Sequence, residues 1–172
     1  MSSETTIYQN KVFTLREVED ETGRRASLDH PGSVGIVPLL ERDGQTYVVL
    51  VRQTRFALGQ RLLEIPAGTR DPGEDAETTA RRELPEEVGY ACGRLDPLGG
   101  FYLAPGYSNE YMRLYVARDL RPQRAAADAD EVDLEAELVP LADAVATARA
   151  GDYHDAKTVL ALLLVGDAAL AV

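Results

Sequence analysis

Apolar and polar residues alternate near the start of the chain, a pattern that is typical of strands with two different faces. The alternation covers Ile7 to Arg25 and is clearest from Val12 to Val18. It breaks at Glu21-Thr22-Gly23, where small and polar residues favour a turn. The segment is therefore predicted to be a β-hairpin.

Two apolar runs follow, rich in Val, Ile and Leu. They cover Val34 to Leu40 and Tyr47 to Val51, and they flank Arg42-Asp43-Gly44. An Asp-Gly pair between two apolar runs is a strong signal for a second hairpin. Because both runs are almost wholly apolar, we expect them at the centre of a sheet.

The pattern becomes helical from Ala76 to Glu87. Asp71-Pro72-Gly73 precedes this helix, and Gly89 follows it as a residue favoured just past a helix C-terminus. Arg121 to Asp130, rich in Ala, Asp and Arg, is predicted to be a mobile loop. Further strands are predicted at Gly99 to Leu103, Tyr111 to Ala117 and Leu134 to Leu138, and closing helices at Leu141 to Ala150 and Ala156 to Leu164. This order of strands and helices favours a mixed α/β sandwich.

Composition narrows the class of protein. The chain has 172 residues, of which 45% are hydrophobic and 27% charged, which indicates a folded domain. Its net charge of -11 argues against a protein that grips a nucleic-acid backbone. The longest apolar stretch, within Val159 to Val165, is too short for a bilayer, and the N-terminal residues are polar. We therefore expect no membrane partner and a cytoplasmic location.

Cysteine and lysine are both scarce. Cys92 is the single cysteine, so the chain can form neither an internal disulfide nor a cysteine-based zinc cluster. The lack of a disulfide agrees with the expected cytoplasmic location. Lys11 and Lys157 are the only lysines, so arginine carries nearly all the positive charge. Its planar fork suits bidentate pairing with phosphate or carboxylate, although genomic base composition accounts for the bias equally well.

The segment GTRDPGEDAETTARRELPEEVGY, which begins at Gly68, contains four glutamates whose spacing matters, at positions 74, 83, 86 and 87. On a helix, Glu83 and Glu87 lie four apart and Glu86 lies three from Glu83, so three carboxylates share one face. Such crowding favours a divalent cation, and oxygen-only ligands suit Mg²⁺ or Mn²⁺. The alternative is a solvated helix face held together by ion pairs with the neighbouring arginines.

The full spacing resembles the Nudix box, Gly-x5-Glu-x7-Arg-Glu-U-x-Glu-Glu-x-Gly-U, in which U is bulky and apolar. Every defined position is filled, by Gly68, Glu74, Arg82, Glu83, Leu84, Glu86, Glu87, Gly89 and Tyr90. The resemblance implies the Nudix fold, an α/β/α sandwich with a mixed sheet, and Mg²⁺ (or Mn²⁺) as cofactor. It further implies that Glu83 and Glu87 are the principal metal ligands, with Glu86 as a further ligand or a water-orienting group. The carbonyl of Ala67 resembles the family's backbone ligand, and Arg82 resembles the arginine that holds a glutamate in place.

One residue departs from the family pattern. Pro85 lies inside the predicted helix, where it deletes one hydrogen bond and crowds the carbonyl of Arg81, at about 3 kcal/mol in an ordinary helix interior. We predict a kink or a tightened turn from Arg81 to Pro85, which puts the pose of Glu86 and Glu87 in doubt.

Flanking segments are similar to those of ADP-ribose pyrophosphatases. In VVLVRQTRFALGQRLLEIPAG, Arg52 and Arg55 match arginines that grip the diphosphate, and Pro105 lies sixteen residues after Gly89, as in that subfamily. DYHDAKTVLALLL resembles the closing helix of the subfamily.

The same resemblance suggests further substrate contacts. Ser108 and Glu110 are expected to meet the ribose or its phosphate, although the preceding Pro105-Gly106 could be a simple turn and Tyr107 a core residue. Arg25 is either a substrate contact or an exposed strand arginine.

The resemblance implies hydrolysis of ADP-ribose to AMP and ribose 5-phosphate by a metal-bound water. The base that takes the proton is expected in the segment DADEVDLE, with Glu131 as first choice and Asp130 as second; a box glutamate such as Glu86 stays open. Another nucleoside diphosphate conjugate (GDP-mannose or a dinucleotide) is the alternative substrate. A non-catalytic Nudix-fold nucleotide sensor is the alternative outside enzymes.

The resemblance also divides the chain into residues 1–30, a small N-terminal antiparallel β subdomain, and residues 31–172, the Nudix hydrolase domain. Related enzymes exchange such a subdomain across a two-fold dimer. We therefore expect a homodimer whose adenine pocket is completed by Arg16 and by an aromatic side chain such as Tyr8 or Phe13.

Overall fold

The computed structural model describes residues 3–123 and 133–170. The strands are β1 (Ser3–Gln9), β2 (Thr14–Asp20), β3 (Gly23–Asp29), β4 (Ser33–Arg42), β5 (Gln45–Arg55), β6 (Gln60–Glu64), β7 (Ala67–Thr69), β8 (Tyr90–Tyr102), β9 (Tyr111–Pro122) and β10 (Glu135–Pro140). The helices are α1 (Ala76–Glu87), α2 (Leu141–Ala150) and α3 (Ala156–Leu170).

A mixed sheet forms the body of the molecule. Its strand order is β10-β5-β4-β9-β8, with β6 paired to β5 and β7 paired to β4. β4 runs parallel to β9, whereas β4 and β5 are antiparallel. The apolar hairpin therefore lies at the centre of the sheet, as predicted. It turns through Asp43 and Gly44, whose φ angles of 52° and 76° are those that an Asp-Gly turn requires.

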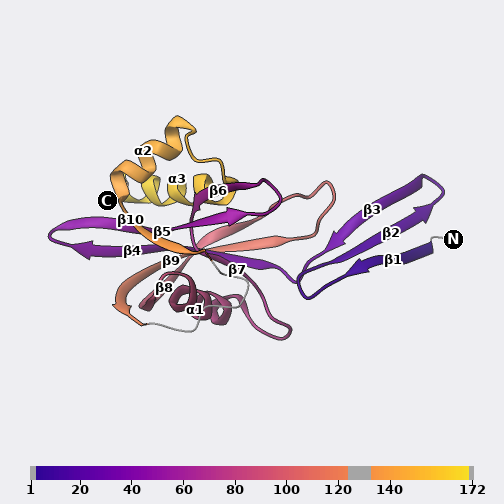
Figure 1. Ribbon diagram of the computed structural model, residues 1–172, viewed down its shortest axis with the longest axis horizontal. Coiled ribbons are helices and arrows are strands. Elements are labelled where there is room, and N and C mark those ends of the chain that lie inside the picture. Colours follow the sequence, from indigo (N-terminus) through magenta and orange to yellow (C-terminus); the bar gives the residue numbers. More distant parts are fainter. Residues whose placement is uncertain (1–2, 124–132, 171–172) are drawn as a thin grey trace.

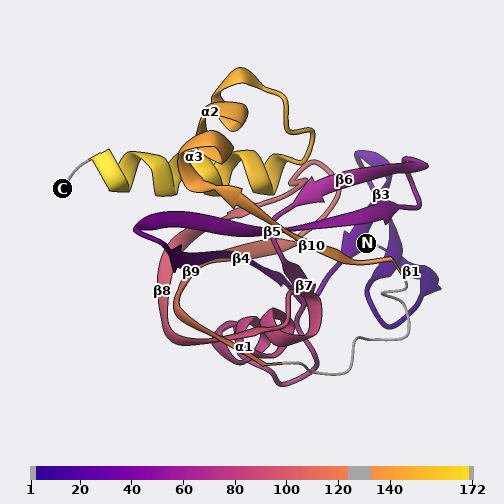
Figure 2. The same cartoon turned by 60° about the vertical axis from the view of Figure 1, so that its left-hand side comes forward.

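The two faces of the sheet carry separate cores because side chains alternate along a strand. On β4, Val37 and Leu39 pack beneath α2 and α3, whereas Val34 and Ile36 pack against α1. Figures 1 and 2 show the result: α1 covers one face of the sheet, and α2 and α3 cover the other. This is the predicted α/β/α sandwich. Within the described part of the chain, no helix is both long and apolar enough to span a bilayer.

Strands β1, β2 and β3 form a separate antiparallel sheet that extends away from the body (Figure 1). The predicted turn at Glu21 and Thr22 joins β2 to β3, while β1 adds a third strand, of which only residues 7–9 fall within the predicted segment. Every residue of β1 is exposed, and the rest of the sheet is at most half-buried. The described chain thus leaves this sheet without a core of its own.

Several boundaries differ from the sequence prediction. β8 begins at Tyr90 rather than Gly99, because it pairs with β9 along almost its whole length despite Pro97 and a register shift between Pro97 and Gly99. An edge strand tolerates proline, since one side of its backbone needs no partner strand. β9 extends through Pro122, so the predicted mobile loop is wrong for its first two residues, and its residues from 124 onward lie outside the described part of the chain.

The short strands β6 and β7 were not predicted. They pair with β5 and β4 at positions where the sequence shows neither alternation nor a long apolar run.

Candidate active site

Helix α1 matches the predicted bounds and presents its acidic residues from a fixed frame. Asp75 caps the N-terminus by accepting a hydrogen bond of 2.8 Å from the Thr78 N–H. Ala76, Ala80 and Leu84, spaced four apart, are buried in the core against β4 and β5. The helix continues without interruption through the buried Pro85 to Glu87, so all the box glutamates on it belong to one element.

The acids of α1 lie against β7. Glu83 is 6% exposed, while Glu86 and Glu87 are half-buried. A methyl group added at Gly68 would come within 1.9 Å of the Glu83 Oε1. The glycine that opens the box is therefore required by close approach, since any side chain would displace Glu83.

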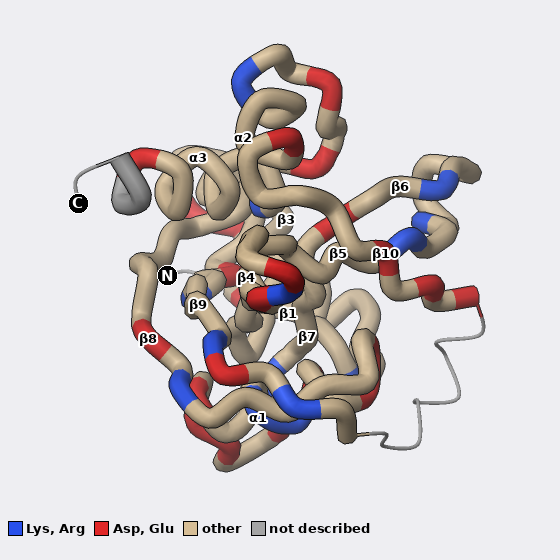
Figure 3. The backbone as a smooth tube through the Cα atoms, turned by 90° about the vertical axis from the view of Figure 1, so that its left-hand side faces the viewer, with Lys and Arg blue, Asp and Glu red and all other residues tan. Residues whose placement is uncertain are grey.

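Arg82 is surrounded by carboxylates, and Figure 3 shows acidic and basic residues gathered around α1. Its Nη1 lies 2.9 Å from the Glu83 Oε1 and 3.0 Å from the Glu86 Oε2, and its Nη2 lies 3.3 Å from the Glu74 Oε2. Partial burial opposes the charged guanidinium, but these carboxylates outweigh it and hold the pKa of Arg82 above its usual value. Arg82 therefore holds Glu83 and Glu86 together on one side of the helix.

Glu74 supports this arrangement from the loop before α1. It accepts hydrogen bonds from the Thr79 hydroxyl at 2.9 Å and from Arg82. Burial alone would raise the pKa of Glu74, but these hydrogen bonds outweigh burial and lower it. The four box residues Glu74, Arg82, Glu83 and Glu86 are thus one connected ionic group.

Ala67 and Glu87 lie side by side. The Ala67 N–H donates a hydrogen bond of 3.0 Å to the Glu87 carboxylate, so the strand residue before the box is fixed at the end of the helix. Glu83, Glu86, Glu87 and the carbonyl of Ala67 offer only oxygen donors, and this chemistry fits Mg²⁺ or Mn²⁺. In the described residues, no three acidic, histidine or cysteine side chains are already gathered around one point. A cation would therefore compete with Arg82 for Glu83 and Glu86.

The two arginines of β5 point to different partners. Arg55 makes a two-point contact with Glu64, and the charge of Glu87 is among the causes that raise its pKa. Arg52 is bonded instead to Glu137 of β10, with its Nη2 2.8 Å from the carboxylate. Residues three apart on a strand face opposite sides. Arg55 and Arg52 are therefore held by different carboxylates, Glu64 of β6 and Glu137 of β10.

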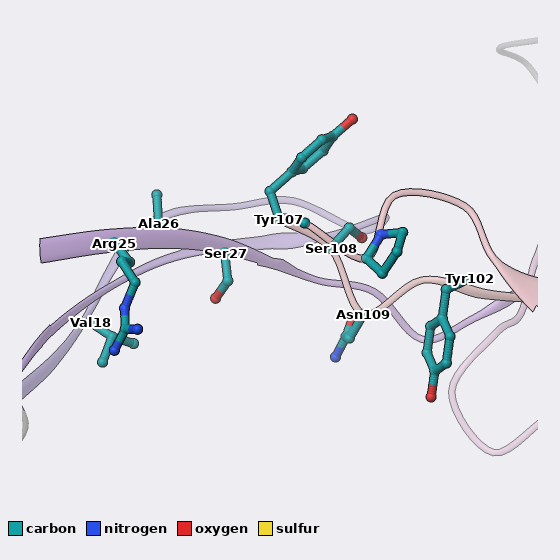
Figure 4. Close-up of a pocket in the computed structure, with 10 residues that line it drawn as sticks. Val18, Arg25, Ala26, Ser27, Tyr102, Tyr107, Ser108 and Asn109 are labelled. Carbon is teal, nitrogen blue, oxygen red and sulfur yellow. The ribbon is translucent and has the colours of Figure 1, made fainter. Parts of the chain in front are cut away.

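A pocket of about 730 Å³ lies between the N-terminal sheet and the loop that joins β8 to β9. It is lined by Val18, Arg25, Ala26, Ser27, Tyr102, Pro105, Gly106, Tyr107, Ser108 and Asn109 (Figure 4). Backbone hydrogen bonds fasten its two walls: the Leu28 N–H donates to the Tyr107 carbonyl at 2.7 Å, and the Asn109 N–H donates to the Leu28 carbonyl at 3.2 Å.

The pocket brings together Arg25 and Ser108, which lie far apart in the chain, but not Glu110. Glu110 accepts a hydrogen bond of 2.7 Å from Ser33, the β4 residue that pairs with Thr69 of β7. It thus links the pocket loop to β4, the strand that pairs with β7. The side chain of Tyr107 is exposed, so the alternative that placed it in the core is wrong.

Two further charged residues, Glu64 and Lys157, were not singled out by any motif. Both are buried and bonded to each other. The sequence signal that could have found them was an acid in the apolar run RLLEIPAG, together with the rarity of lysine. The expected base residues, Glu131 and Asp130, lie outside the described residues.

Comparison with known proteins agrees with the geometry of α1 and β7. The NUDIX domain family model matches residues 29–163. The chain is 34% identical to the methanol dehydrogenase activator of Bacillus methanolicus, over 92% of this chain and 90% of that protein. It is 33% identical to the ADP-ribose pyrophosphatase of Bacillus subtilis (strain 168), over 91% of this chain and 86% of that protein.

Among solved structures, the crystal structure of an ADP compounds hydrolase superposes with a TM-score of 0.77 at 30% identity, covering 96% of this chain and 90% of that one. A filled box, the sandwich fold around it and these relatives lead to one assignment. The chain belongs to the NUDIX domain family and is a Nudix hydrolase.

Proposed function

We propose that this protein hydrolyses the diphosphate bridge of ADP-ribose to give AMP and ribose 5-phosphate, with Mg²⁺ as cofactor. The observation that carries the proposal is the placement of Glu83 and Glu87 on the last turns of α1 against Gly68 and Ala67 of β7, with Glu86 joined to them through Arg82. Similarity to the ADP-ribose pyrophosphatase of Bacillus subtilis and to the ADP compounds hydrolase supports an ADP-containing substrate.

The residues of the box are proposed to have two roles, holding the cation and orienting its ligands. Glu83, Glu86, Glu87 and the Ala67 carbonyl would hold the cation, and Arg82 keeps two of those acids oriented. When bound, a divalent cation supplies neutralisation of phosphate charge and activation of water.

Substrate contacts come from outside the helix. Arg55, which is held by Glu64 of β6, is proposed to bind the diphosphate, and Arg52 is the second arginine proposed for this role. Arg25 and Ser108 line the neighbouring pocket, which is large enough for a nucleoside, and Glu110 is proposed to meet the ribose from the same loop.

The proton of the attacking water needs an acceptor. We propose Glu131 as this base, with Asp130 and Glu86 as the alternatives. Three single variants, Glu131→Gln, Asp130→Asn and Glu86→Gln, test which residue has the role. The variant that removes the base should lower kcat with little change in KM, because a base acts on the reacting water and not on substrate binding.

A homodimer is part of the proposal. The N-terminal sheet exposes Ile7 and Tyr8 to more than half of their area, and every residue of β1 is exposed. A three-stranded sheet needs a packed face to be stable. A second copy of the chain would supply that face and would bring Arg16 and the contacting rings of Tyr8 and Phe13 (5.9 Å between centroids) toward its pocket.

A substrate panel tests the proposal. Purified protein with Mg²⁺ is offered ADP-ribose, GDP-mannose, FAD and a nicotinamide dinucleotide, and turnover is followed by coupling product release to a phosphatase. We expect ADP-ribose to give the highest kcat/KM. Highest kcat/KM for GDP-mannose or a dinucleotide would replace the substrate but keep the reaction type, and no turnover of any conjugate would refute the proposal.

A single substitution separates an enzyme from a nucleotide sensor. Glu87→Gln keeps the shape of the side chain and removes its charge, so turnover should fall by about 100-fold or more while the melting temperature changes little. Metal titration of both proteins checks that the loss follows weaker Mg²⁺ binding.

A further inference from the structure

Four alternating charges meet where strand β6 ends and helix α3 begins. Glu64 is 1% exposed and Lys157 is 7% exposed, although neither belongs to the box. The Lys157 Nζ donates to the Glu64 carboxylate and lies 2.9 Å from the Asp155 Oδ2. With Arg55 on the other side of Glu64, these residues form a row of four charges, Arg55-Glu64-Lys157-Asp155, which we call the charge row.

The outer end of the charge row is a guanidinium in a fixed plane. The Arg55 Nε lies 2.7 Å from the Glu64 Oε1, and its Nη2 lies 2.5 Å from the Glu64 Oε2. Such a two-point contact sets the direction of the guanidinium as well as its place. The side chain of Arg55 is 39% exposed, so part of the guanidinium still faces solvent.

The inner end of the charge row is anchored to the first turn of α3. The Asp155 carboxylate accepts the Thr158 N–H at 3.0 Å, which is the geometry of a helix N-cap. The Thr158 hydroxyl in turn accepts the Ile65 N–H at 2.9 Å. Because Ile65 follows Glu64 directly, α3 and the strand that carries Glu64 are held in a fixed relation.

Stability alone does not account for buried charges at this place. Taking an ion pair out of water costs several kcal/mol per ion, and apolar side chains of the same size commonly stabilise a core as well or better. What an apolar pair at positions 64 and 157 could not provide is a directed acceptor for Arg55. The free-energy cost of burying the charges of Glu64 and Lys157 is therefore explained if the direction of the Arg55 guanidinium matters for substrate binding.

We propose that Glu64 and Lys157 are positioning residues that set the guanidinium of Arg55 toward the diphosphate of the substrate. The inference rests on the proposed function of Arg55 and deepens it, because it assigns a role at the site to the closing helix α3. Lys157 fixes Glu64, and Glu64 fixes Arg55. Neither residue touches substrate.

The test uses a variant that removes the pair without leaving a buried charge alone. Glu64→Gln with Lys157→Met keeps both side-chain volumes and deletes one charge of each sign, so the protein should fold. The matched control is Arg149→Met, which breaks an exposed ion pair between α2 and α3 (3.1 Å to Asp167). Melting temperatures are recorded for both.

Steady-state kinetics with ADP-ribose give the first readout. We expect the double variant to raise KM about 10-fold or more with a smaller change in kcat, whereas the control leaves both unchanged. The same pair of substitutions made in an Arg55→Ala background should cause no further rise in KM. An unchanged KM in the double variant, or an equal rise in both backgrounds, would overturn the proposal.

Arg55→Lys provides a second variant at a half-exposed position, where folding is not at risk. Lysine keeps the charge but cannot make the two-point contact with Glu64. It should raise KM nearly as much as Arg55→Ala. A wild-type KM in Arg55→Lys would show that direction is unimportant and would contradict the proposal.

Binding of inorganic pyrophosphate, measured by calorimetry with Mg²⁺, separates this inference from the proposed function. If no conjugate is turned over but Arg55-dependent pyrophosphate binding weakens about 10-fold in the double variant, the hydrolase substrate is wrong and the positioning role stands. If ADP-ribose is turned over but pyrophosphate binding is unaffected by the double variant, the positioning role fails alone.

Discussion

At the scale of single residues, the site depends on how closely backbone and carboxylate approach each other. Gly68 leaves room for the Glu83 carboxylate, and Arg82 holds Glu83 and Glu86 at hydrogen-bonding distance. The carboxylates of Glu83 and Glu86 are thus positioned by their neighbours Gly68 and Arg82.

Gly68→Ala tests this close approach. The new methyl group would overlap Glu83, so we expect kcat/KM to fall by about 100-fold, together with some loss of stability. Gly44→Ala is the control, because alanine is strained at its φ of 76° in a turn of the β4–β5 hairpin. It should lower the melting temperature without lowering kcat/KM; equal losses of activity in both variants would contradict the explanation.

At the scale of elements, α1 combines a strong cap with an unfavourable interior residue. Asp75 caps the first turn, and Pro85 lies in the last turn without breaking it. The predicted bounds of this helix were correct because its cap, its apolar stripe and its following glycine are all local signals.

Asp75→Ala should lower the melting temperature at neutral pH. The hydrogen bonds from Thr78 lower the pKa of Asp75 from its ordinary 3.8, so the carboxylate stabilises the folded state above that pH and loses this effect as the pH falls through the folded value. The melting temperatures of the wild type and the variant should therefore converge in acid. Asp75→Asn should retain most of the cap at neutral pH, and a constant difference between wild type and Asp75→Ala down to about pH 2 would be inconsistent with this account.

Pro85→Ala should stabilise the protein modestly. Restoring the hydrogen bond to the Arg81 carbonyl is worth about 3 kcal/mol in a helix interior. Losing two buried methylenes costs about 1.6 kcal/mol. We expect a net gain of about 1 kcal/mol in urea unfolding, and a crystal structure of the variant would show whether Pro85 bends the helix as predicted. A net loss of stability would mean that the proline ring contributes more packing than its size suggests.

At the scale of the whole molecule, the architecture consists of a sandwich with two cores and a largely exposed N-terminal sheet. The sandwich buries both faces of its sheet, whereas within the described residues the N-terminal sheet meets the body mainly at Leu28 and the loop carrying Tyr107 and Asn109. The exposed residues of the N-terminal sheet are why the proposed function includes a second copy.

Light scattering at micromolar concentration should give the mass of two chains. Ile7→Lys places a charge on the exposed N-terminal sheet and should shift the equilibrium toward one chain, with a rise in KM for ADP-ribose. Gln45→Lys, an exposed strand position on the body, is the matched control and should remain dimeric. A wild-type protein that scatters as a single chain at all concentrations would refute the dimer.

The sequence by itself determined the elements that depend on local patterns and the acidic residues that one of those elements carries. Periodicity predicted the central hairpin and all three helices, and the spacing of the box placed Glu83, Glu86 and Glu87 on one helix face. Such features follow from residues within about four positions of each other, so they can be recognised along the chain.

Only the tertiary structure decided the relations between distant segments. It extended β8 along β9, added the short strands β6 and β7, paired Arg52 with Glu137, and buried Glu64 with Lys157, 93 residues later in the chain. The physical reason is that strand pairing and buried ion pairs depend on contacts between residues that are distant in the sequence. A local pattern of apolar and polar residues does not contain that information.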